Sequence, residues 1–100
     1  MEGEYNVKPR IVNEGSSIYR VGGMTVQTLS YVCPANQTVT LNFPEPFKQY
    51  VFACFAYNAQ VGFGALQTIS CGAANLSQCM VYQNNQVNAQ CALQIVAMGY

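Results

Sequence analysis

Apolar and polar residues alternate in two stretches of this chain, which is the pattern of a β-strand with one buried face. The two stretches are residues 38–43 and 89–98. The side chains on their apolar faces are Val39, Leu41, Phe43, Cys91, Leu93, Ile95 and Ala97. No stretch keeps the apolar spacing of about 3.6 residues that marks a helix, so the pattern predicts strands and turns.

Four more segments have the composition of strands, namely 24–33, 50–57, 66–71 and 79–83. The segment 50–57 is apolar on both of its faces. This pattern is typical of a central strand that is covered on both sides, so we expect this segment in the middle of the core.

The connections between these segments are rich in turn-forming residues. Pro44 and Pro46 cannot take part in ladder pairing and predict a rigid corner. Six to eight short strands joined by such turns indicate an all-β domain, either an antiparallel β-sandwich or an open barrel, and we expect the sandwich. The residues expected in its core are Val39, Leu41, Phe43, Val51, Phe52, Phe55, Ile69, Leu93 and Ile95.

The length of 100 residues suits one domain. Residues 1–17 hold three of the four carboxylates and two of the four cations, so we interpret them as a polar lead-in or linker. Residues 18–100 are then the β-sandwich. No apolar run is long enough to span a bilayer, and no secretory signal is visible at the start. The chain is either made in the cytosol and released by another route, or an excised domain.

Charged residues make up only 8% of the chain, and the formal net charge is zero. Amide and hydroxyl side chains take their place. The four cations are scattered, so the chain lacks the positive field that nucleic-acid binding requires. A domain of this size is marginal alone, and interface cores are poor in charge, so part of this surface is expected to be buried against sister chains.

The five cysteines are an odd number without C-x-x-C spacing, which argues against a zinc site. They are Cys33, Cys54, Cys71, Cys79 and Cys91. Most lie in apolar runs, where a thiol behaves as a small hydrophobe, and buried free thiols are the first interpretation. One or two disulfides are a second interpretation, and a reactive thiol is a third.

Catalytic chemistry is poorly supported, because the chain has no His and no Asp. Its carboxylates are Glu2, Glu4, Glu14 and Glu45. Only Glu14 and Glu45 could form a glycosidase-like pair, and Glu45 lies between two prolines at an expected solvated corner. No cysteine has a neighbouring cation to activate it. We therefore predict no enzyme, no catalytic residue, no metal and no cofactor.

Binding is the chemistry that remains. Neutral sugars are recognised by aromatic faces together with amides and hydroxyls, and the expected loops carry both kinds of group. The candidate receptor-binding residues are Phe63, Asn75, Asn84 and Asn85. The alternative interpretation is that the amides only solubilise turns and that Phe63 packs into the core.

The order of several stretches along the sequence resembles a known family. The stretch GGMTVQ at residues 22–27 is followed by TVTLNFPEPF at 38–47, then by the apolar VFACFAYN at 51–58, and residues 97–100 read AMGY. This order is similar to the C-terminal, receptor-binding domain of tailed-bacteriophage tail fibre proteins. The chain departs from that pattern in its many cysteines and in having no Trp near Leu29.

The resemblance implies a β-sandwich knob at the distal end of a homotrimeric fibre. Its implied partners are two further copies of itself, an upstream fibre shaft, and a bacterial surface glycan or outer-membrane protein. The implied location is the tail fibre of a virion that is made in the cytoplasm of the host bacterium. Host adsorption would then proceed without nucleic acid, membrane insertion or covalent chemistry.

Two alternatives stay open. The chain could be a structural or decoration protein of the virion that binds no host. It could also be a fragment of a sugar-hydrolysing tailspike, which the shortage of carboxylates disfavours.

Overall fold

The computed structural model describes residues 10–13 and 15–100, with the side chains described from Gly15 onward. The described part contains eight strands and no helix. The strands are β1 (Arg10–Asn13), β2 (Ser16–Val21), β3 (Met24–Cys33), β4 (Gln37–Asn42), β5 (Val51–Asn58), β6 (Gln67–Ala73), β7 (Gln78–Asn85) and β8 (Cys91–Gly99). Residues 1–9 and 14 of the expected lead-in lie outside the described residues, and the boundary at residue 18 stays a prediction.

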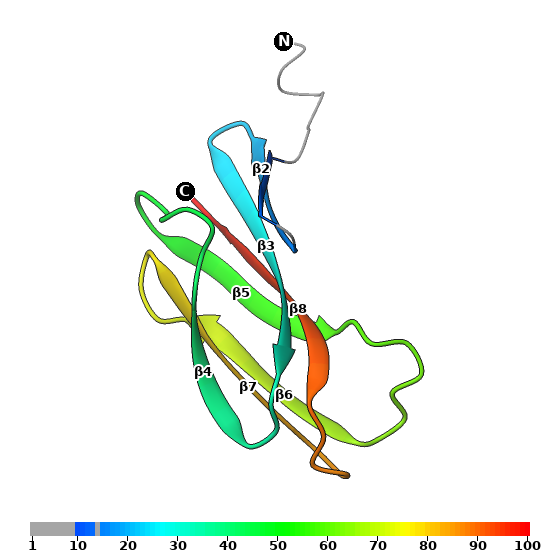
Figure 1. Ribbon diagram of the computed structural model, residues 1–100. Coiled ribbons are helices and arrows are strands. Elements are labelled where there is room, and N and C mark those ends of the chain that lie inside the picture. The colour runs from blue at the N-terminus through cyan, green and yellow to red at the C-terminus, as the bar shows by residue number, and fades with distance from the viewer. Residues whose placement is uncertain (1–9, 14) are drawn as a thin grey trace.

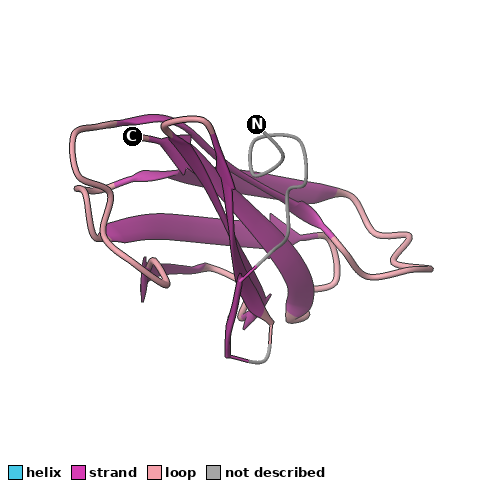
Figure 2. Ribbon diagram, turned by 90° about the horizontal axis from the view of Figure 1, so that it is seen from above, coloured by secondary structure: helices cyan, strands magenta, loops and turns pink. Residues whose placement is uncertain are grey.

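The strands form two antiparallel sheets that pack face to face (Figures 1 and 2). One sheet has the order β1-β2-β3-β8-β5 and the other has the order β4-β7-β6. The predicted all-β antiparallel sandwich is therefore confirmed. The long strand β8 lies between β3 and β5, and β7 lies between β4 and β6, so these two strands form the centre of the sandwich.

The core lies between the two sheets and follows the alternation of β8. Every second residue of β8 is buried, from Cys91 through Leu93 and Ile95 to Ala97. From the second sheet, Val81 and Cys79 face them. Of the other side chains expected in the core, Phe43 is buried, and four are half-buried and packed against the core, namely Val39, Leu41, Val51 and Ile69.

The prediction for the segment 50–57 is wrong. It forms β5, which is an edge strand, and only one of its faces is turned towards the second sheet. The small residues Cys54 and Ala56 pack against the core. Phe52 and Phe55, which we expected in the core, are 52% and 44% exposed. The second apolar face of this edge strand is therefore left without a covering layer from the described part of the chain.

The corner between β4 and β5 is held by a buried glutamine. Gln27 on β3 is 1% exposed, and its amide donates to the Glu45 carbonyl oxygen at 2.6 Å and accepts from the Glu45 N–H at 3.0 Å. The side chain thus replaces the strand partner that the two flanking prolines exclude. Phe43 and Phe47 pack edge to face across the corner, with ring centroids 5.1 Å apart, and both reach the core.

This geometry predicts that Gln27→Ala destabilises the fold by about 2 kcal/mol, because two backbone groups of Glu45 lose their partner in a partly buried site. The matched control is Arg20→Ala, which breaks the exposed ion pair between Arg20 and the Glu45 side chain at 2.9 Å. That change should cost less than about 1 kcal/mol. Urea unfolding followed by circular dichroism measures both, and equal losses would contradict the role given to Gln27.

Candidate binding surfaces

Connecting segments gather at the two ends of the sandwich (Figure 1). We call one end the loop end, which consists of residues 34–36, 59–66 and 86–90. The other is the corner end, which consists of residues 22–23, 43–50 and 74–77. The longest connection at the loop end, 59–66, projects away from both sheets in Figure 1.

A buried amide joins both sheets beneath the loop end. Gln83 on β7 is fully buried, and its Nε2 donates to the carbonyl oxygens of Cys33 at 2.9 Å and Ala89 at 3.0 Å. Its Oε1 accepts from Gln67 at 3.1 Å and from Asn85 at 3.0 Å. One uncharged side chain therefore ties together the end of β3, the start of β6 and the 86–90 loop.

Asparagines shape the two shorter loops. The Asn85 Oδ1 accepts from the backbone N–H groups of Val87 at 3.2 Å and Ala89 at 3.0 Å, which closes the 86–90 loop. Asn36 donates to Asn88 across the two loops at 2.8 Å. Both Asn36 and Asn88 have positive φ, a conformation that Asn tolerates better than most residues. These loops are consequently fixed by side-chain hydrogen bonds.

The long 59–66 loop is anchored at its base. Asn58 Oδ1 accepts from the Gln60 N–H at 2.7 Å, and Asn58 Nδ2 donates to Gln67 at 3.0 Å. The ring of Phe63 is half-buried and packs against the core. With these anchors in place, Val61 and Leu66 remain 99% and 76% exposed. The loop therefore presents apolar side chains to the solvent from a held base.

The structure brings three of the four predicted contact residues to the loop end. Phe63 and Asn84 are half-buried there, and Asn85 is buried with its amide engaged in the loop. Asn75 lies at the corner end, exposed, where it bonds to Ser77 and Gln78. Contact of each residue with a receptor stays a prediction.

Sequence reasoning missed the exposed apolar rim of the loop end, which consists of Val61, Leu66 and Val87. Val87 is 65% exposed in the middle of an amide-rich turn. For Val61 and Val87 the available signal was an isolated apolar residue flanked by glycine or amide residues, where no strand periodicity gives it a buried face.

A second surface is the aromatic stripe on the outer face of the five-stranded sheet. Its members are Tyr50, Phe52, Phe55, Tyr57 and Tyr100, and all of them are exposed. The Tyr100 ring lies 5.3 Å from that of Tyr50 and 6.1 Å from that of Phe52. Val96 and Met98 of β8 pair with β5 beside the stripe and extend its apolar character. A monomer leaves this surface in water.

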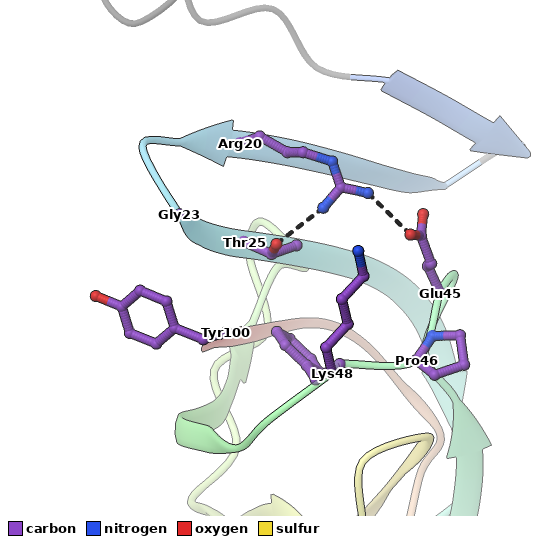
Figure 3. A pocket seen from close by; sticks show the side chains of 8 residues that line it. Arg20, Gly23, Thr25, Glu45, Pro46, Lys48 and Tyr100 are labelled. Atoms are coloured by element: carbon purple, nitrogen blue, oxygen red, sulfur yellow. Dashed lines mark hydrogen bonds and ion pairs between the residues drawn. The ribbon is translucent and has the colours of Figure 1, made fainter.

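A third feature is a cavity of about 280 Å³ at the corner end (Figure 3). The Arg20 guanidinium donates to Thr25 Oγ1 and pairs with Glu45, both at 2.9 Å, and the Lys48 side chain points towards this pair. The Tyr100 carbonyl oxygen accepts from three successive backbone N–H groups, those of residues 48–50, at 2.7–3.2 Å. The Glu45 carboxylate therefore offsets the charge of Arg20 at the rim of the cavity, which Lys48 also lines.

The cysteines offer no activated nucleophile. All five are free, and three of them, Cys33, Cys79 and Cys91, are buried as the first of our three interpretations expects, whereas Cys54 and Cys71 are half-buried. Burial raises the pKa of the Cys33 thiol. The hydrogen bond with the Cys54 thiol, with burial adding to it, raises the pKa of Cys71 to about 11. The thiols of Cys33 and Cys71 are therefore protonated at neutral pH, whereas a nucleophile would need to be a thiolate.

Residues 10–13 and 15–100 contain neither a metal-ligand cluster nor a membrane-spanning helix. No group of three metal-ligating side chains comes together among them. They also contain no helix with the length and apolar character needed to cross a membrane.

The chain matches no known protein family model and no curated protein. It does match solved structures of pyocin tail fibres. An N-truncated R2-type pyocin tail fibre aligns with a TM-score of 0.77 and 20% identity, over 94% of this chain and 37% of that one. The C-terminal fragment of the Pseudomonas aeruginosa R2 pyocin fibre aligns with the same TM-score and identity, over 26% of its length.

The C-terminal fragment of the P. aeruginosa R1 pyocin fibre aligns with a TM-score of 0.72 and 18% identity, over 94% of this chain and 28% of that one. This chain thus spans about a third of each fibre structure or less. At such identities the likeness establishes the fold, which is one found in the tail fibres of phage-tail-like particles.

The hydrogen bonds of Gln83 predict that Gln83→Ala destabilises the protein by about 3 kcal/mol, since four partners lose a bond at once, two of them in fully buried bonds. Gln90→Ala is the matched control, because Gln90 is exposed on the same end of the sandwich, and it should change stability by less than about 0.5 kcal/mol. Urea denaturation measures both, and a small effect of Gln83→Ala would show that the amide network is dispensable.

Proposed function

We propose that this chain is the receptor-binding tip of the tail fibre of a bacteriophage or phage-tail-like particle. It attaches the particle to a surface glycan or an outer-membrane protein of a bacterium. The observation that carries the proposal is the fold, which matches tail-fibre structures over 94% of this chain. In this proposal the protein adsorbs reversibly and performs no catalysis.

The loop end is the surface that we assign to the receptor. Its amide network fixes the loops before binding, which lowers the entropy cost of association. The exposed Val61, Leu66 and Val87 can cover the C–H faces of a sugar, and Asn84, near the end of β7 that leads into the 86–90 loop, offers an amide. Receptors are commonly bound by loops that a rigid scaffold positions.

The path of the chain supports an orientation in which the loop end points away from the particle. Arg10, the first described residue, pairs with Ile18, which pairs with Gln27, which in turn pairs with Ala97. This row of residues lies in the half of the sheet nearer the corner end. An upstream fibre shaft would join on that side, so the loop end would point away from the particle.

We assign the aromatic stripe to contacts between copies in a homotrimer. Exposed apolar patches on small domains mark association surfaces, and aromatic residues are enriched in interface cores. Association would cover the second apolar face of β5. Three linked tips would also raise the avidity of weak receptor sites by roughly 10²–10⁴-fold.

The receptor assignment predicts that fluorescently labelled protein binds some strains in a panel of bacteria that includes P. aeruginosa. Val61→Asp, which places a charge on the apolar rim, and Asn84→Ala should each lower the bound fluorescence at least about tenfold. Gln49→Ala, an exposed amide at the corner end, should not. Binding to other virion proteins and to no strain would instead support the decoration role.

The trimer assignment predicts a mass in solution of three times 10.9 kDa, measured by light scattering after size exclusion. Phe55→Glu should reduce this to the monomer mass, because it introduces charge into the aromatic stripe. Met80→Glu changes a similarly exposed apolar residue on the three-stranded sheet and should leave the trimer intact. A monomer at every concentration of the unmodified protein would overturn the assignment.

A further inference from the structure

Two thiols meet where the edges of the two sheets come together. Cys54 lies on β5 of the five-stranded sheet and Cys71 lies on β6 of the three-stranded sheet. Their sulfur atoms are 3.8 Å apart, and both residues are half-buried. We propose that Cys54 and Cys71 are a redox-sensitive pair that a small disulfide compound oxidises to a disulfide bond between the sheets.

The position of the pair gives the bond a mechanical consequence. β5 and β6 are the edge strands of their sheets, and no backbone ladder joins them in the described part of the chain. They are connected through the 59–66 loop of the loop end. Cys54 precedes that loop and Cys71 follows it, 17 positions later. A bond between them would close the base of the loop covalently.

The two sulfurs are already in contact. A disulfide bond is about 2.05 Å long, so sulfur atoms that lie 3.8 Å apart must approach one another by a little under ~2 Å to form it. The thiol of Cys79 also interacts with both partners. Cys33 and Cys91 are opposite each other in the register of β3 and β8. Both are fully buried, so a dissolved reagent cannot reach them.

The oxidation balances as a thiol–disulfide exchange with oxidised glutathione as the oxidant. The thiolate of one cysteine attacks glutathione disulfide, its S–S bond breaks, and one glutathione thiolate leaves as a mixed disulfide forms. The second cysteine then attacks the protein sulfur of that mixed disulfide and displaces the second glutathione. The two cysteines give up two electrons and two protons in total, and glutathione disulfide becomes two glutathione thiols.

The rate of this reaction follows the thiolate population. The groups that face Cys71 are the thiols of Cys54 and Cys79, and its raised pKa of about 11 keeps it protonated at neutral pH. Exchange at neutral pH is therefore slow, and the redox poise of a reducing cytosol keeps the pair reduced there. The rate should rise about tenfold per pH unit between pH 7 and 9.

The test incubates the whole folded chain with oxidised glutathione at about pH 8.5. We expect the intact mass to fall by about 2 Da, that of two hydrogen atoms, and the free thiols to fall from five to three. A peptic digest at acid pH should yield peptides linked through Cys54 and Cys71. The melting temperature should rise by about 10 °C and return after treatment with dithiothreitol.

Cys54→Ala should abolish the linked peptide, and Cys91→Ala, in which the pair is intact, should retain it. The proposal is overturned by an unchanged thiol count, by a bond that maps to another pair, or by a glutathione adduct that persists without ring closure. The mapping uses the unmodified chain, so it stands even where a variant folds poorly. None of these readouts depends on a receptor or a trimer, so failure here would leave the proposed function untouched.

Discussion

The ends of this sandwich depend on hydrogen bonds from two buried glutamine side chains. Gln27 satisfies both backbone groups of Glu45 at the corner, and Gln83 satisfies groups on both sheets at the loop end. Loops leave backbone N–H and C=O groups without ladder partners, and a buried polar group without a partner is costly. An amide supplies both a donor and an acceptor without the larger penalty of a buried charge. The low charge of the chain is consistent with this way of building its ends.

The strand β5 shows where a single chain leaves its packing incomplete. Its inner face adds Cys54 and Ala56 to the core, whereas its outer face leaves Phe55 and Tyr57 in water. Two proposals arise from this one strand. The outer aromatics need a cover, which association would provide, and the inner thiol meets Cys71 because small residues let the two sheet edges approach.

The sequence predicts the strands well because alternation is a local property of the backbone. The buried residues of β8 could be predicted from the period of two residues in its sequence alone. The same reasoning failed for Phe52 and Phe55, because an apolar strand face does not reveal whether its cover is another sheet or another molecule. The hydrogen bonds that hold the loop end were harder to predict from the sequence than the strands. Gln83 bonds to Cys33, 50 positions away, and no local pattern signals that contact.

At the loop end, the side chains that hold the loops in place are different from the side chains that the loops present to the solvent. The amides of Gln83 and Asn85 face inward and are fully engaged, whereas Val61 and Val87 face solvent and have no polar side-chain atoms to place. Changing an exposed side chain that has no bonded partner costs little stability. If the loop end contacts the receptor, as proposed, the rim can therefore vary in shape and chemistry while the amide base stays constant. A binding tip that must follow changes in its target gains most from that separation.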